Sequence, residues 1–201
     1  VSIEVEGTSH KNSVILSMFI KPGDEVGETE IVQDLRRIYS LGYFLDVSAS
    51  RKSVEGGYQL IIHVQENPIL QEVKIINELH VFKKEELIEL FKSQLGKTGN
   101  LMDIRQTKEK IEEMYKAKGY AFANVKIVQE SLVQEGAISV VGILEVQINE
   151  GIIEDIRIKG NVETKPYVIL REITLKKGEL FNSITMEQDL ARVFNTNFFE
   201  T

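Results

Sequence analysis

The sequence predicts an α+β protein made of tandem β-α-α-β-β units, each a three-stranded sheet with two helices packed on one face. Alternating apolar segments typical of half-buried strands recur along the chain, and each precedes two helix-length apolar patterns. The second helix pattern ends each time in a similar motif, SLGYF, AKGYA or NTNFF. Gly42, Gly119 and Asn197 in these motifs lie 77 and 78 residues apart, which indicates an internal repeat.

Composition restricts the function classes. The 201 residues carry a net charge of −7 and include no cysteine. The negative charge argues against a general nucleic-acid-binding protein and against a polybasic grip on anionic lipid. Without cysteine the chain has no disulfide framework and no thiol chemistry. The apolar run at 14–20 is far shorter than the roughly 20 residues that span a bilayer, and the chain opens in a strand pattern, so we expect it to be part of a longer protein.

The first strand of each unit is expected at residues 3–7, 73–77 and 156–161, because apolar residues occupy every second position there. These residues are Ile3 and Val5, Val73 and Ile75, and Ile156 and Ile158.

Two helices should follow each of these strands, separated by glycine turns at 20–26, 94–100 and 175–181. The first helix of each unit carries Val14, Ile15, Met18 and Phe19; Leu87, Ile88, Leu90 and Phe91; and Val168, Ile169 and Ile173. The second carries Ile31, Leu35 and Ile38; Ile111, Met114 and Tyr115; and Met186, Leu190 and Val193.

The second helix is expected to end in a left-handed residue at Gly42, Gly119 and Asn197, since glycine and asparagine adopt that conformation. The aromatic pairs that follow, Tyr43 with Phe44 and Phe198 with Phe199, should seal the helix end against the core. The alternative is that they are binding anchors.

Two hairpins complete the first two units. Residues 46–54 and 58–67 form one, and residues 124–132 and 138–151 form the other, with glycine-containing breaks as turn signals. We therefore divide the chain into a unit at 1–67, a unit at 68–151 and a partial β-α-α unit at 152–201 that lacks its hairpin. The links between units are short, which predicts a semi-rigid, articulated rod.

This unit resembles the POTRA (polypeptide-transport-associated) domain of BamA-type outer-membrane assembly factors. The similar stretches are LRRIYSLGYFLDV (35–47), EEMYKAKGYAFANVKI (112–127), IRIKGN (156–161) and VILREITLKKGELF (168–181). The second unit departs from the family pattern, with Asn77 in place of glycine and extra residues around GKTGN.

The resemblance implies a non-catalytic periplasmic scaffold that receives unfolded outer-membrane proteins and docks accessory lipoproteins, with periplasmic chaperones as further partners. It also implies a membrane β-barrel beyond Thr201, and an organellar intermembrane space if the protein is eukaryotic. Alternatives are the POTRA region of a two-partner secretion transporter or of an organellar import pore, and more remotely a cell-division scaffold of the FtsQ type.

Strand addition is the expected mode of binding, because a sheet edge leaves backbone N–H and C=O groups unpaired. By resemblance the binding edge is the second strand of each unit. Its candidate residues are Val47, Ser48, Ala49, Ser50, Arg51 and Lys52 in the first unit and Asn124, Val125, Lys126, Ile127, Val128 and Gln129 in the second. The alternative is that Arg51, Lys52 and Lys126 are charges that protect these edges from pairing.

Other motifs predict no chemistry. The GKTGN segment lacks the earlier glycine and the preceding strand of a phosphate-binding loop. His10, His63 and His80 are scattered and have no metal-ligand spacing. Acidic residues at 85–89 and 24–30 lie near helix starts, where carboxylates favour the helix dipole. We expect no catalytic residue, no cofactor, no metal and no nucleic-acid partner.

Overall fold

The computed structural model describes residues 1–128, 141–161 and 163–196, which divide between two compact units. The first unit comprises Val1–Val73, Phe91–Gln106 and, beyond the undescribed residues, the chain up to Leu144. The second comprises Lys74–Leu90, Thr107–Val128 and the chain from Glu145 onward.

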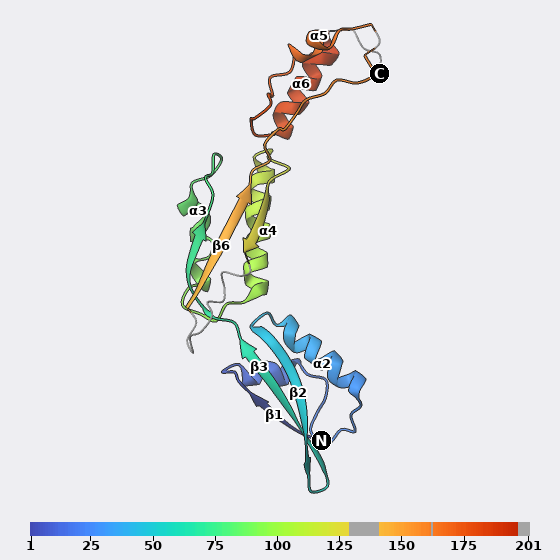
Figure 1. Ribbon diagram of the computed structural model, residues 1–201, viewed down its shortest axis with the longest axis vertical. Coiled ribbons are helices and arrows are strands. Elements are labelled where there is room, and N and C mark those ends of the chain that lie inside the picture. Colours follow the sequence, from blue (N-terminus) through green and yellow to red (C-terminus); the bar gives the residue numbers. More distant parts are fainter. Residues whose placement is uncertain (129–140, 162, 197–201) are drawn as a thin grey trace. The chain divides into compact units, whose positions relative to one another are not determined.

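The first sheet contains β1 (Ser2–Glu6), β2 (Phe44–Val54) and β3 (Gly57–Glu66) in the order β1-β3-β2 (Figure 1). The central strand β3 pairs in parallel with β1 and antiparallel with β2. A two-residue turn joins β2 to β3, and Gly56 supplies the positive φ (85°) that such turns require. This order leaves one side of β2 at the edge of the sheet.

The helices α1 (Lys11–Ser17) and α2 (Glu28–Ser40) cover one face of this sheet. Apolar residues at every second position of the strands meet the apolar stripe of the helices, as a two-layer sandwich requires. The buried cluster consists of Val5, Val14, Met18, Ile20, Ile31, Ile38, Phe44, Leu60, Ile62 and Val64.

The second sheet contains β4 (Ile69–Ile75), β6 (Val141–Asn149) and β5 (Asn124–Val128) in the order β4-β6-β5. Its helical elements are α3 (Lys84–Glu89), a short 3₁₀ turn η1 (Lys92–Gln94) and α4 (Leu101–Ala117). The strand β5 pairs antiparallel with β6 and forms the edge. Two three-stranded sheets with helices packed on them confirm the predicted α+β class.

The helix-ending glycines are confirmed at two of the three predicted positions. Gly42 has φ 82° and Gly119 has φ 90°, the left-handed conformation that closes a helix. Phe44 is fully buried at the end of α2, and Tyr43 stacks on His10 with ring centroids 4.5 Å apart. Asn197, Phe198 and Phe199 lie outside the described residues.

The predicted strand at 156–161 is wrong. The described part of 152–196 contains α5 (Pro166–Leu170), α6 (Ser183–Asn195) and an isolated bridge between Ile152 and Leu180, but no strand. In the first repeat the equivalent strand, β1, pairs with β3. The described part of 152–196 contains no strand with which residues 156–161 could pair in the same way. The predicted apolar face of α6 is only partly covered: Met186 and Val193 are half-buried, whereas Leu190 is 43% exposed.

Candidate functional site

The outward backbone groups of β2 follow from its pairing with β3. Val47 pairs with Val64, whose carbonyl oxygen faces the β1 side, where a Cβ added at Gly7 would collide with it. Val47 and Val64 therefore form a non-hydrogen-bonded pair, in which each residue points its N–H and C=O groups away from the other. The N–H and C=O of Val47 therefore point to the open edge, and the two-residue period of a strand adds those of Ala49 and Arg51.

A shallow groove runs along this edge between β2 and α2. It is lined by Ile31 and Val32 of α2, Ala49 and Arg51 of β2, Leu60 of β3 and Glu28. Ile31 and Leu60 are buried, whereas Val32 is 45% exposed, so the groove presents aliphatic surface to solvent. Ala49 and Arg51, whose backbone groups point to the open edge, thus also have their side chains in this groove.

The opposite face of β2 is polar. Ser50 Oγ lies 2.7 Å from His63 Nε2, and His63 Nδ1 lies 3.2 Å from Glu6 Oε2, so a polar chain crosses all three strands. Ser48 and Lys52 are exposed on the same face. The β2 edge thus has one apolar side and one polar side.

At the β5 edge, Val125 also belongs to a non-hydrogen-bonded pair, but its outward N–H group is already bound. Val125 pairs with Ile148, whose N–H donates to Asn77 Oδ1 (3.0 Å) and whose carbonyl accepts from Asn77 Nδ2 (2.8 Å). The backbone of Ile148 thus points away from β5, and Val125 N–H points to the open edge. There it donates to Glu112 Oε1 of α4 at 2.9 Å.

The structure places the remaining candidates of β5 unevenly. Asn124 and Lys126 are exposed, Ile127 and Val128 are half-buried, and Gln129 lies outside the described residues. The described part of β5 has five residues, whereas β2 has eleven. Within the described residues, the edge at β2 is therefore the longer of the two.

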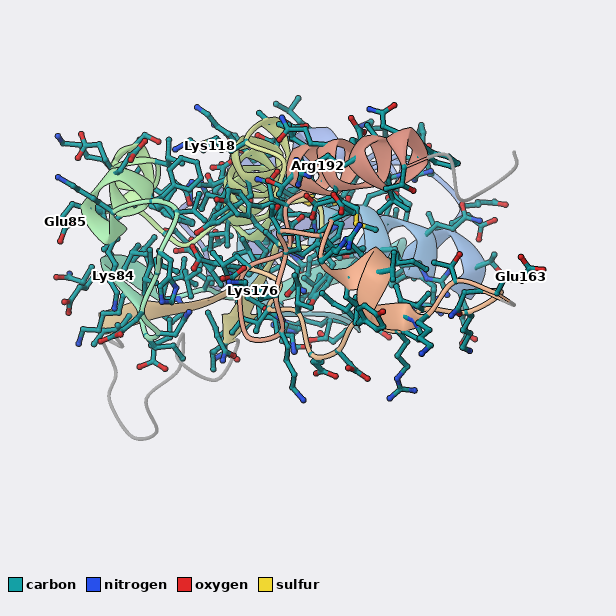
Figure 2. The ribbon with its side chains drawn as sticks, turned by 90° about the horizontal axis from the view of Figure 1, so that it is seen from above. Lys84, Glu85, Lys118, Glu163, Lys176 and Arg192 are labelled. Carbon is teal, nitrogen blue, oxygen red and sulfur yellow. The ribbon has the colours of Figure 1, made fainter. Side chains whose placement is uncertain are left out.

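Two buried aspartates escaped the sequence analysis. Asp34 accepts the N–H groups of Phe19 and Ile20 at 2.9 Å, and Asp189 accepts those of Thr174 and Leu175. Each carboxylate also pairs with an arginine three residues later, Arg37 or Arg192, the latter on α6 in Figure 2. The repeated tripeptide QDL at 33–35 and 188–190 is the signal that could have identified them. Burial would raise the pKa of Asp189, but these hydrogen bonds and Arg192 hold it below its usual value.

A second pair of carboxylates fixes the loop before the first helix of each of the first two repeats. Glu66 accepts from Thr8 Oγ1 (2.5 Å) and Ser9 N–H (2.7 Å). Glu150 accepts from the N–H groups of His80 and Val81, at 2.8 and 3.0 Å. Burial alone would raise the pKa of both carboxyls, but these hydrogen bonds hold them below their usual value.

The described residues contain no group of three or more carboxylate, histidine or cysteine side chains placed to hold a metal ion. Within the same residues, none of the helices combines the length and the apolar character needed to cross a bilayer.

Comparison with known sequences identifies the fold family. The model of the POTRA family, described as a surface antigen variable number repeat, matches residues 68–151 and 152–201, more than half of the chain. The chain belongs to the POTRA family. The sequence-based resemblance is therefore confirmed, while the division into units at 1–67, 68–151 and 152–201 stays a prediction.

The curated relatives include an outer-membrane protein and a chloroplastic outer-envelope protein. The chain is 25% identical over 186 residues to outer membrane protein assembly factor BamA of Nitratidesulfovibrio vulgaris, covering 91% of the chain and 23% of that protein. It is 22% identical over 189 residues to the chloroplastic outer envelope protein 80 of Oryza sativa, covering 90% of the chain and 27% of that protein. The chain thus spans about a quarter of the length of these relatives.

Solved POTRA structures are similar over the whole chain. POTRA1-3 of the periplasmic domain of Omp85 from Anabaena is 29% identical, with a TM-score of 0.80 over 100% of this chain and 85% of that one. The N-terminal domain of Omp85 from Thermosynechococcus elongatus is 27% identical, with a TM-score of 0.72 over 100% of this chain and 86% of that one. The chain is a POTRA region of the Omp85 and BamA type.

Proposed function

We propose that this POTRA region is a non-catalytic periplasmic scaffold of an outer-membrane β-barrel assembly factor, and that it receives unfolded outer-membrane proteins by strand addition. The similarity to BamA and Omp85 proteins supports the location and the process. Docking of accessory lipoproteins and of periplasmic chaperones belongs to the same proposal and rests on that similarity alone.

The observation that carries the proposal is the two-sided edge of β2. The outward backbone groups of Val47, Ala49 and Arg51 offer a ladder to an incoming strand. Strands of outer-membrane barrels alternate apolar and polar residues. Such a strand would place its apolar side chains along the groove beside Val32 and its polar ones beside Ser48 and Ser50.

The energy scale predicts weak, sequence-tolerant binding. Each net hydrogen bond contributes about 0.5–1.5 kcal/mol, whereas ordering each client residue costs roughly 1–2 kcal/mol of backbone entropy. The two nearly cancel, so the groove contacts decide whether a strand stays. A handover site in an assembly pathway needs this weak binding.

Proline at position 49 tests the proposal. Because Ala49 N–H points to the open edge, Ala49→Pro removes one client hydrogen bond and none of the β2–β3 ladder, and edge strands tolerate proline in this orientation. Ala49→Val keeps the N–H and serves as the matched control. Crosslinking of an unfolded outer-membrane client through a photoreactive residue at Lys52 should fall in the proline variant and persist in the valine variant. Equal crosslinking by a correctly folded proline variant would contradict strand addition at β2.

The organellar version of this role is a second candidate, because a chloroplastic outer envelope protein is also a relative. Fractionation of the source cells distinguishes the two candidates. The bacterial role requires the protein in the outer-membrane fraction, and the organellar role requires it in an organellar envelope fraction.

A further inference from the structure

The described parts of the β2 and β5 edges differ in how an outward N–H group is bound. Val125 N–H, which points out of β5, is already bound to the carboxylate of Glu112 at 2.9 Å. Glu112 is held in place by Lys108 one helical turn earlier, with Nζ 3.8 Å from the same Oε1 atom. A client strand would have to place its own carbonyl oxygen where this carboxylate lies.

We propose that Glu112 is a guard residue that closes the β5 edge to strand addition, so that an extended strand of alternating polarity binds at β2 and is refused at β5. This inference rests on the strand addition proposed above. A carboxylate is a stronger acceptor than a client's neutral carbonyl, because charge-assisted hydrogen bonds are about twice as strong as neutral ones. When a client strand pairs with β5, the N–H of Val125 therefore exchanges a stronger hydrogen bond, to Glu112, for a weaker one, to the client's carbonyl oxygen.

The first repeat has no such guard. Glu112 lies seven residues before Gly119, and the residue seven before Gly42 is Leu35. Leu35 packs partly buried against the core of the first sheet and has no acceptor to offer. Among the described residues, no side chain of α2 forms a hydrogen bond to the backbone of β2.

A lysine also lies on β5, but it does not occupy the outward N–H that Glu112 binds. The backbone groups of Lys126 are bonded to Gln147 of β6, and its exposed side chain lies on the opposite face of the sheet from the buried Val125. Glu112, from the helix layer, directly occupies one outward N–H of the ladder, that of Val125. Its side chain is 21% exposed, which places the carboxylate between solvent and the sheet.

Reciprocal exchange of the two equivalent residues tests the guard. Glu112→Leu installs the residue of the first repeat and should open β5, while Leu35→Glu should close β2. Glu112→Gln keeps an oxygen acceptor but loses the charge that makes it stronger than a client carbonyl, so it should open β5 only in part. Glu113→Leu changes the charge by the same amount at an exposed neighbouring position and is the matched control.

The probe is a synthetic peptide of alternating apolar and polar residues that carries a fluorophore, crosslinked in the full-length protein through a photoreactive residue at Lys52 or at Lys126. In the wild type the peptide should crosslink at Lys52 and not at Lys126. Glu112→Leu should raise crosslinking at Lys126 at least about tenfold, the factor that corresponds to one lost hydrogen bond to a charged acceptor. Amide exchange at Val125 should accelerate in the same variant and stay unchanged in Glu113→Leu.

The outcomes separate the guard from the proposed function. Strong wild-type crosslinking at Lys126, unchanged by Glu112→Leu, would overturn the guard and leave strand addition standing. A gain at Lys126 without any crosslinking at Lys52 would support the guard and overturn the assignment of β2. Absence of crosslinking at both positions in every correctly folded variant would overturn both.

Discussion

The phenolic oxygen of Tyr115 donates a hydrogen bond to Glu150 Oε1 at 2.8 Å, and both side chains are buried, at 0% and 5% exposure. Tyr115 comes from α4, and Glu150 follows β6 directly. Burial, with this hydrogen bond and the nearby carboxylate, raises the pKa of Tyr115, so the phenol stays protonated at any physiological pH. One carboxylate thus ties the second helix of its repeat to the loop at His80.

This relationship predicts acid sensitivity. The folded-state pKa of Glu150 is lowered, so its stabilising contribution is complete above the unfolded value of about 4.3 and is lost as the pH falls through the folded value. Glu66 and Asp189 are shifted in the same direction and add to the effect. The urea midpoint should therefore fall progressively as the pH drops below about 4.3.

Glu150→Gln isolates one part of that pH dependence. This variant should be less stable at pH 7 and should lose less of its urea midpoint on acidification than the wild type. Glu163→Gln, at an exposed position labelled in Figure 2, is the control and should retain the wild-type pH dependence. An acid dependence unchanged by Glu150→Gln would show that other carboxyls carry the effect.

Asp34 should be a stability residue. Asp34→Ala leaves the N–H groups of Phe19 and Ile20 without their acceptor and removes the partner of Arg37. We expect a loss of about 3 kcal/mol, since each buried unsatisfied donor costs about 1–3 kcal/mol. Thermal unfolding followed by circular dichroism measures it. Glu30→Ala, an exposed residue of the same helix, should change the midpoint little, and an equally small effect of Asp34→Ala would contradict the assigned role.

Gly42 combines backbone strain with a close contact. Its φ is 82°, and an added Cβ would collide with Asn100 Oδ1. Gly23 also has a positive φ, 100°, but an added Cβ there meets nothing within 4 Å. Gly42→Ala should therefore lower the thermal midpoint more than Gly23→Ala, which reports the strain of about 1–2 kcal/mol alone. Equal shifts would mean that the Asn100 contact carries no energy.

The sequence was sufficient for features that depend on local chemistry. Gly42 and Gly119 were predicted as left-handed caps because few other residues adopt that conformation, and both are confirmed. The strand predicted at 156–161 failed because a strand also needs a partner along its edge, and periodicity reports only which residues are apolar. The same alternation of apolar residues occurs in β1, which does form a strand because β3 pairs with it.

The candidate edges show the same limit. The sequence located β2 and β5, but the direction of each backbone group depends on register, which Val64 and Ile148 reveal only through their contacts. The hydrogen bond between Glu112 and Val125 joins residues on different elements, so no spacing rule predicts it. Asp34 and Asp189 were missed although their QDL motif repeats, because an aspartate on a helix is ordinarily exposed to solvent.

The central claim is that a client strand pairs with β2 through its outward backbone groups. Amide hydrogen exchange measured residue by residue, with and without a saturating alternating-polarity peptide, tests it most directly. The account predicts that the peptide slows exchange at Val47, Ala49 and Arg51. Ser48, Ser50 and Lys52, already bonded to β3, should change little. Protection that is equal at all six residues, or absent at Val47, Ala49 and Arg51 while the peptide is bound, would contradict strand addition at this edge.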